Sequence, residues 1–244
     1  MLYWLIKYVF VGPFLRVTGR PTFEGRENFP ASGPALLVGN HLSVADWLFM
    51  PLVAPRRVTF LAKSDYYTGT GIKGMLSRWF FAGTGQHPID RTNADSAQAA
   101  LDAGMEVLSA GDLLCIYPEG TRSPDGRLYR GKTGPARLAM RAGVPIVPVG
   151  VIGSDEYVRR IRRFPGSARV RVRIGEPLDT AAWADRVGDR AAEREITDEL
   201  MRRIQGLTGQ EYVHDTYGAD EKKRLEALRA SGHNLLDLPV DEQR

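Results

Sequence analysis

The chain has 244 residues, of which 43% are hydrophobic and 25% charged, so its composition is that of a globular protein and excludes a disordered chain. The net charge of +4 and the pI of about 9.3 favour anionic partners, namely phosphate groups, acidic lipid surfaces or nucleic acid. The single cysteine, Cys115, excludes an internal disulfide and a cysteine-based zinc site.

The first 15 residues are strongly apolar and are interrupted only by Lys7 and by Gly12-Pro13. They are shorter than the roughly 20 residues of a spanning helix, and they lack the charged start and cleavage site of a signal peptide. Aromatic residues with polar groups suit a membrane interface. The aromatic residues of this stretch that suit an interface are Tyr3, Trp4, Tyr8 and Phe10. We therefore expect residues 1–16 to form an apolar helix that lies in the interface, the alternative being a buried helix that covers the domain.

Hydrophobic patterns predict the remaining elements in chain order. They are an extended segment at 17–25, a strand at 34–39, a helix at 44–53, a strand at 57–62, a helix at 72–81, an extended stretch that ends near 91, a helix at 93–110, a strand at 113–117, a helix at 134–142, strands at 144–152 and 169–174, and helices at 190–207 and 221–230.

This alternation of strands and helices predicts an α/β fold, with a single-domain mixed β-sheet flanked by helices and preceded by the N-terminal interfacial helix. Two prolines in 144–152 predict that this strand is irregular or lies at an edge of the sheet. We expect residues 17–210 to form one catalytic domain and residues 211–244 to form a C-terminal helix and a mobile tail.

A histidine and a carboxylate lie between the strand at 34–39 and the helix that follows it. Open α/β sheets bind ligands just outside the carboxyl ends of their strands, which is where this turn falls. His41 can act as a general base if Asp46 fixes its tautomer. The pair can meet only if His41 precedes the helix and Asp46 lies in its first turn, with Ser43 as the N-cap of a capping box. The alternative is that these residues only form a turn and a helix cap.

Further polar segments follow other predicted strands. In Pro118-Glu-Gly-Thr-Arg-Ser123, Arg122 can bind a phosphate with two hydrogen bonds and Gly120 allows backbone to approach a ligand. Arg91 is a second candidate for binding phosphate, and Lys63 and Lys132 are candidate contacts to a phosphate or an oxyanion. The alternative for the segment at 118–123 is a surface turn with a local Glu–Arg pair, and the alternative for the two lysines is that they are solvated. A basic cluster can face anionic lipid headgroups or simply be solvated. It consists of Arg159, Arg160, Arg162 and Arg163.

The order Asn-His-Leu-Ser-Val-Ala-Asp, Ile-Asp-Arg, Tyr-Pro-Glu-Gly-Thr-Arg-Ser and Val-Pro-Ile-Val-Pro-Val resembles the glycerolipid acyltransferase family over about residues 20–180. The resemblance implies that His41 is the catalytic base and Asp46 its orienting acid. It also implies a segment for binding the acceptor phosphate and a role of residues 144–149 in binding the acyl donor or in site structure. The phosphate-binding residues would be Arg91, Glu119, Gly120, Thr121 and Arg122. The polar residues 85–88 before Arg91 depart from the apolar lead-in usual in the family.

The expected reaction is acyl transfer from acyl-CoA or acyl carrier protein to the free hydroxyl of 1-acylglycerol 3-phosphate, which gives phosphatidic acid. Backbone N–H groups at the start of the helix after His41, or a nearby lysine, would stabilise the oxyanion. We expect no metal, no cofactor and no nucleic-acid partner, and a peripheral, monotopic location on the cytoplasmic face of the cell membrane. The alternatives are the same chemistry on glycerol 3-phosphate or on another lysolipid or glycolipid, a hydrolase, and a non-enzymatic membrane-lipid-binding protein.

Overall fold

A computed structural model describes residues 2–63, 71–72, 74–75, 80, 83–89, 96–214, 227 and 231. Most of the predicted helix 72–81, the residue Arg91, and most of the predicted helix 221–230 with the tail after it lie outside these residues. Among the described residues, no helix combines the length and apolar character that crossing a bilayer requires.

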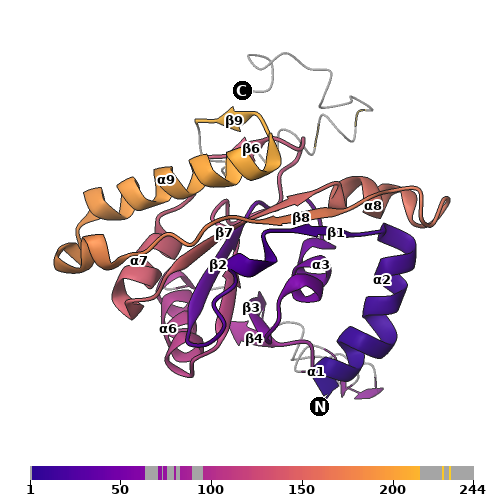
Figure 1. The fold of residues 1–244 in the computed structure, drawn as a ribbon, viewed down its shortest axis with the longest axis horizontal. Coiled ribbons are helices and arrows are strands. Elements are labelled where there is room, and N and C mark those ends of the chain that lie inside the picture. Colours follow the sequence, from indigo (N-terminus) through magenta and orange to yellow (C-terminus); the bar gives the residue numbers. More distant parts are fainter. Residues whose placement is uncertain are drawn as a thin grey trace.

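Seven strands form the central sheet in the order β1-β8-β7-β2-β5-β3-β4, shown in Figure 1. The β7–β8 pair is antiparallel and every other pair in this sheet is parallel, so the predicted mixed sheet is confirmed. The strands are β1 (Thr22–Glu24), β2 (Ala35–Gly39), β3 (Val58–Lys63), β4 (Gln86–Ile89), β5 (Leu113–Ile116), β7 (Ile146–Ile152) and β8 (Arg171–Ile174). A separate two-stranded sheet pairs β6 (Leu128–Tyr129) with β9 (Tyr212–Val213).

Helices cover both faces of the sheet, which gives three layers (Figure 1). The helices are α1 (Leu2–Leu5), the π-helix η1 (Ile6–Phe10), α2 (Val11–Gly19), α3 (Asp46–Val53), α6 (Ser96–Ser109), α7 (Gly134–Ala142), α8 (Ser154–Arg160) and α9 (Arg190–Thr208), with short 3₁₀ helices η2 (Arg26–Asn28) and η3 (Ala181–Arg186). These bounds agree within a few residues with the helices predicted at 44–53, 93–110, 134–142 and 190–207.

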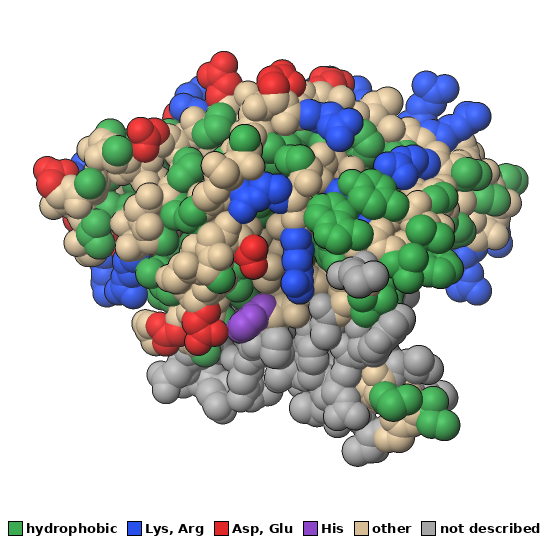
Figure 2. All heavy atoms as spheres, turned by 60° about the horizontal axis from the view of Figure 1, so that its bottom comes forward, with side chains coloured by type: hydrophobic (Ala, Val, Ile, Leu, Met, Phe, Trp, Pro, Cys, Tyr) green, Lys and Arg blue, Asp and Glu red, His purple; other side chains and the backbone are tan. Residues whose placement is uncertain are grey.

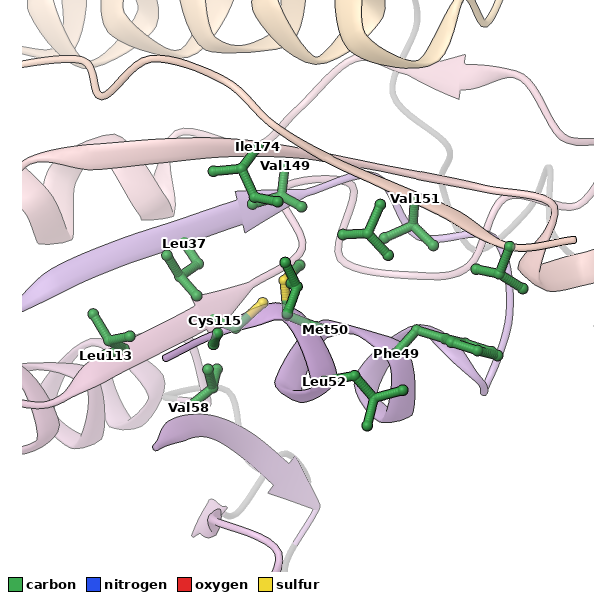
Figure 3. Close-up of a cluster of buried hydrophobic side chains, with 14 of the residues drawn as sticks. Leu37, Phe49, Met50, Leu52, Val58, Leu113, Cys115, Val149, Val151 and Ile174 are labelled. Atoms are coloured by element: carbon green, nitrogen blue, oxygen red, sulfur yellow. The ribbon is translucent and has the colours of Figure 1, made fainter. Parts of the chain in front are cut away.

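Strand β2 is buried along its whole length, as is typical of a central parallel strand between two helical layers. Because successive side chains of a strand point to opposite faces, Leu36 packs with the layer of α6, α7 and α9 whereas Leu37 packs with α3. Figure 3 shows the cluster that contains Leu37, in which Met50 of α3 lies between Cys115 and Val149 of the sheet. Two cores therefore fix the end of β2 in place.

The predicted edge position of the strand at 144–152 is wrong, because β7 lies inside the sheet between β8 and β2. Pro145 precedes the strand, and only Pro148 lies within it. Pairing of β7 with β8 begins at Val149, one residue after this proline, and the Pro148 carbonyl still accepts the N–H of Gly175 at 2.9 Å. The missing N–H of Pro148 therefore falls where the antiparallel ladder ends, which makes an interior proline tolerable.

The N-terminal helices α1, η1 and α2 follow one another from Leu2 to Gly19, so residues 17–19 are helical and not extended as predicted. Lys7 interrupts the apolar sequence but is buried, and its Nζ donates to the carbonyl of Ala54 at the end of α3 (2.6 Å). Much of the outer surface of these helices is exposed and apolar, with Phe10 at 62% and Val17 at 73%. The helices thus pack on α3 with one face and expose an apolar face on the other.

Candidate active site

The predicted site segments lie together because they follow the carboxyl ends of neighbouring parallel strands. Asn40 and His41 follow β2, Tyr117 and Glu119 follow β5, and Ser154 begins α8 just after β7. Since β7, β2 and β5 are adjacent and parallel, these residues meet where the carboxyl ends of the three strands lie side by side.

His41 and Asp46 form the hydrogen-bonded pair that the sequence predicts. His41 Nδ1 lies 2.7 Å from Asp46 Oδ2, the imidazole side chain is 19% exposed and the carboxylate is fully buried. An ionised carboxylate only accepts hydrogen bonds, so Nδ1 bears the proton and Nε2 is free to accept one. The geometry is that of a general base with its orienting carboxylate.

Asp46 is held from several sides. Its Oδ2 also accepts the backbone N–H groups of Leu42 (2.8 Å) and Ser43 (2.9 Å). Its Oδ1 accepts a short hydrogen bond from the hydroxyl of Ser154 and a longer one from Ser43 Oγ (3.5 Å). These donors fix the carboxylate and supply hydrogen bonds to its buried charge.

The helix cap differs in detail from the predicted capping box. Helix α3 begins at Asp46, later than predicted, and its N-cap position is Ala45. The Ser43 hydroxyl accepts the N–H of Ala45 (3.0 Å), while Asp46 reaches back to the N–H of Ser43. The second half of the capping box is therefore present, and it places Asp46 towards His41 as the spacing predicts.

The N–H groups at the start of α3 were candidates for stabilising an oxyanion, but several of them already have acceptors. Those of Leu42 and Ser43 donate to Asp46, and that of Ala45 donates to Ser43 Oγ. Because a donor must be available in advance to stabilise a developing charge, these three groups do not fit the expectation.

The His41 ring stacks on the Tyr117 ring, with 4.0 Å between ring centroids and 11° between the ring planes. The stacking contact fixes the plane of the imidazole ring, whereas the hydrogen bond from Nδ1 to Asp46 fixes how the ring is turned within that plane. The Tyr117 hydroxyl is buried and has no hydrogen-bond partner among the described residues, and burial raises its pKa well above the ordinary value.

Glu119 differs from its predicted role in binding the acceptor phosphate. It is 4% exposed, and its two carboxylate oxygens accept the backbone N–H groups of His41 (3.0 Å) and Tyr129 (3.1 Å). Burial raises the pKa of this carboxyl to about 8, against the opposing effect of these two hydrogen bonds. Glu119 therefore connects the loop after β5 to the backbone of His41, and a buried carboxyl so occupied does not present itself to a phosphate.

The loop after β5 also contacts His41 through its backbone. The carbonyl of His41 accepts the N–H of Ser123 (2.7 Å), so Arg122, the preceding residue, lies at the site. Gly120 has a positive φ of 75°, and a Cβ atom there would lie 3.0 Å from Lys132 Nζ. Arg122 and Lys132 are exposed and form no ion pair with other described residues. Arg122 of this loop and Lys132, which follows β6 and contacts the loop at Pro118, thus place two cations near the carboxyl ends of β2 and β5.

Hydrogen bonds brace this loop internally and from the C-terminal segment. Asp125 accepts from Ser123, Arg127 and Tyr129 at distances of 3.2 Å or less. Gln210, which follows α9, donates to the carbonyl of Gly126 (2.6 Å) and accepts from the buried side chain of Asn40 (2.8 Å).

Asn40 in turn hydrogen-bonds both the carbonyl and the N–H of Val151, each at 2.8 Å. The loop, the residue before His41 and the end of β7 therefore form one network. The β6–β9 pairing also places residues 212–213 on this loop. The proposed domain boundary at 210 stays a prediction.

The structure leaves two predicted residues untested. Arg91 lies outside the described residues, and Lys63 ends β3 but its side chain is not described. Within the described part of the chain, no group of three or more His, Cys, Asp or Glu side chains is arranged to hold a metal ion.

No role at the site was predicted for Ser154, Tyr117, Asn40 and Gln210, although Asn40 and Tyr117 lie within the quoted motifs. For Ser154 and Tyr117 a signal existed, because Ser154 follows a predicted apolar strand and Tyr117 is the last residue of another. Gln210 carries no such signal, since it meets Asn40 across 170 positions of the chain.

An α/β domain with a His-x4-Asp pair at the carboxyl edge of its sheet, beside a cationic loop, is the arrangement of an acyltransferase domain. The family model described as Acyltransferase matches residues 20–152, and the chain belongs to this family.

The curated relatives of the chain include 1-acyl-sn-glycerol-3-phosphate acyltransferase alpha of Homo sapiens, 35% identical over 181 residues that cover 69% of this chain and 61% of the relative. The chloroplastic 1-acyl-sn-glycerol-3-phosphate acyltransferase LPAT1 of Arabidopsis thaliana is 33% identical over 147 residues, 60% of this chain and 38% of the relative. The chain therefore spans only part of the length of these relatives.

A crystal structure also matches the fold, that of the 1-acyl-sn-glycerophosphate (LPA) acyltransferase PlsC from Thermotoga maritima. The TM-score is 0.58 at 25% sequence identity, and the match covers 80% of this chain and 74% of that chain.

Proposed function

We propose that this protein transfers a fatty acyl group from acyl-CoA or acyl carrier protein to the free hydroxyl of 1-acylglycerol 3-phosphate, giving phosphatidic acid. The observation that carries the proposal is the His41 Nδ1–Asp46 Oδ2 hydrogen bond of 2.7 Å at the sheet edge where the cationic loop lies. Family membership and the names of the relatives support the reaction class and the acceptor.

In the proposed reaction, Nε2 of His41 accepts the proton of the acceptor hydroxyl as its oxygen attacks the thioester carbonyl. Asp46 holds the ring in the required tautomer and stabilises the imidazolium that forms. The tetrahedral intermediate then breaks its C–S bond, and the imidazolium gives its proton to the leaving thiolate. The products are the new ester and the free thiol, and the proton transfers use only side chains of this chain, without a cofactor.

The acceptor phosphate binds Arg122 and Lys132 in this proposal, with Arg91 as a further contact. Arg122 can donate two parallel hydrogen bonds to phosphate oxygens, whereas Lys132 supplies a compact positive charge beside Gly120. Holding the phosphate places the acceptor hydroxyl near His41, and such positioning can lower the barrier by several kcal/mol. Lys63 and Lys132 remain the candidate donors to the oxyanion.

We place the reaction at the cytoplasmic face of the cell membrane, with the N-terminal helices lying in the interface. Their exposed aromatic residues support this location, since such side chains collect at the boundary of water and lipid.

The proposal is tested by comparing His41→Ala with His87→Ala, a control histidine that pairs loosely with Glu106 (3.6 Å). Purified variants are assayed for thiol release and for phosphatidic acid by mass spectrometry. His41→Ala should lose roughly 10²–10⁴-fold in kcat, as expected for loss of general base catalysis, and keep its thermal unfolding transition. A folded His41→Ala variant with normal activity would overturn the mechanism.

The same assay separates the alternatives. Thiol release without an acceptor would indicate a hydrolase. Faster turnover with glycerol 3-phosphate or with a lysolipid that lacks phosphate would replace the proposed acceptor.

A further inference from the structure

The segment that follows α8 is unusually basic. Residues 157–175 contain seven arginines and neither aspartate nor glutamate. Three of them pair with carboxylates from outside this segment, in the pairs Arg159–Asp155, Arg160–Glu156 and Arg173–Glu24. The other four are exposed and form no ion pair with described residues; they are Arg162, Arg163, Arg169 and Arg171.

Exposed apolar side chains lie beside these arginines. Phe164, which directly follows two of the unpaired arginines, is 65% exposed. Phe10, Phe14 and Val17 are 62%, 55% and 73% exposed, and their spacing of four and three residues places them on one side of the N-terminal helices. Contiguous apolar surface of this kind is uncommon on a soluble protein and indicates a surface that binds something.

Backbone hydrogen bonds join the two parts into one surface. The N–H of Gly166 donates to the carbonyl of Thr18 (2.9 Å), and that of Val170 donates to the carbonyl of Gly19 (3.0 Å). The hydroxyls of Tyr157 and Thr18 lie 3.0 Å apart. Phe164 and its arginines are therefore fixed against the end of the helix that exposes Phe14 and Val17. Figure 2 shows hydrophobic side chains gathered on the right of the view, where α2 lies in Figure 1, with Lys and Arg side chains around them.

We propose that this surface, formed by residues 158–171 and the exposed side of α2, binds an anionic lipid leaflet. The unpaired arginines contact lipid phosphates while Phe164 and the apolar residues of α2 enter the interface. The inference rests on the proposed reaction at a membrane surface, and it adds a second contact and a preference for negatively charged lipids. Charge complementarity selects this partner, because a zwitterionic leaflet has no net negative charge to balance the four unpaired arginines.

Helix α8 connects this surface to the catalytic pair. Ser154, whose hydroxyl donates to Asp46, is the first residue of α8, and the arginine segment begins at the end of the same helix. Seven helical residues span about 10 Å. The lipid headgroups would thus lie about one short helix from His41, which allows an acceptor hydroxyl to reach the base while its acyl chain stays in the leaflet.

The test uses the full chain with Arg162→Gln and Arg163→Gln combined, in flotation with vesicles of phosphatidylcholine alone or mixed with phosphatidylglycerol. At about 1 kcal/mol per charge, binding to the mixed vesicles should weaken roughly 30-fold at low salt. Binding to phosphatidylcholine alone should stay the same, and high salt should reduce the difference. The matched control combines Arg141→Gln with Arg190→Gln, two exposed arginines of α7 and α9 without ion pairs to described residues, and should bind like the unchanged protein.

Unchanged binding of the Arg162/Arg163 variant to the mixed vesicles, or an equal loss in the control, would overturn the inference. A change in oligomeric state by size-exclusion chromatography without a change in vesicle binding would also overturn it, because a second copy would then occupy the surface. Acyl transfer in detergent micelles is measured in parallel and should not differ between the variants. If the unchanged protein fails to transfer acyl groups in micelles, the proposed function is rejected. The vesicle measurements would still test whether the surface binds anionic lipid.

Discussion

Glu119 accepts the backbone N–H of His41 at 3.0 Å across 78 positions of the chain. Its other oxygen accepts the N–H of Tyr129 in β6, so one buried carboxyl connects the loop after β5 both to the backbone of His41 and to the backbone of β6. This relationship gives the glutamate of the Glu-Gly-Thr-Arg segment a positioning role, where the sequence predicted a contact to phosphate.

Glu119→Gln should lower kcat by about 10–100-fold with little change in the KM for the acceptor. The amide NH₂ group of glutamine cannot accept, so one of the two backbone N–H groups loses its acceptor in a buried place, at a cost of about 1–3 kcal/mol. Steady-state kinetics and thermal unfolding measure the two effects. The control is Glu106→Gln, whose side chain is 73% exposed, and equal losses in both variants would contradict the assignment.

The same variant tests a pH effect on stability. The pKa of Glu119 is raised to about 8 in the folded protein, so between about pH 4.5 and pH 8 the folded state binds a proton that the unfolded state has released. Stability due to this group therefore falls as pH rises through that interval. Urea unfolding across it should show a decline that Glu119→Gln lacks, and parallel curves for the two proteins would contradict the raised pKa.

Ser154→Ala should lower kcat by about tenfold and leave both KM values nearly unchanged. The substitution removes the Ser154 donor from the buried carboxylate of Asp46, whose Oδ1 then keeps only the longer contact with Ser43 Oγ. Asp46 would hold His41 less firmly, which affects the chemical step more than substrate binding. Thr197→Ala, which removes another buried hydroxyl, is the control. A matching loss of kcat in this control would show that buried hydroxyls act through stability alone.

These residues also show what the sequence could predict. The turn with His41 and Asp46 was predictable because both residues lie within one local motif, between an apolar strand and a helix. The position of the site at the carboxyl ends of the strands was predictable as well, since each strand end can be located along the chain. The partners Glu119 and Ser154 were not predictable as contacts, because the sheet order that brings β5 and β7 beside β2 is a long-range property. The interior position of β7 was missed because the argument from its prolines did not include where its pairing with β8 begins.

Arg122→Gln should raise the KM for 1-acylglycerol 3-phosphate by about tenfold or more, because a charge-assisted hydrogen bond to phosphate contributes about 1.5–3 kcal/mol. The KM for the acyl donor should change little. The acceptor itself offers the control, since a monoacylglycerol without phosphate should be used equally well by both proteins. If Arg122→Gln weakens both acceptors to the same extent, the arginine does not bind the phosphate.

Lys7→Met should change how stability depends on pH. Burial and the nearby Arg16 and Arg26 lower the pKa of Lys7 to about 8, whereas the unfolded chain keeps a value near 10.5. Between these values the unfolded state binds a proton that the folded state lacks, so stability due to Lys7 rises with pH in this interval. Urea unfolding from pH 7 to pH 10.5 should show this rise in the unchanged protein relative to Lys7→Met.

The size of the rise in unfolding free energy with pH distinguishes a buried Lys7 ammonium from a solvated one. Lys7 donates to the Ala54 carbonyl and lies over the rings of Trp4 and Tyr8, at 5.1 and 5.2 Å from their centroids. These contacts offset part of the desolvation, yet the lowered pKa shows that burial has the larger effect. Lys132→Met, at an exposed lysine, should keep the pH dependence of the unchanged protein. If Lys7→Met keeps it as well, the N-terminal helices do not pack on α3 with Lys7 between them.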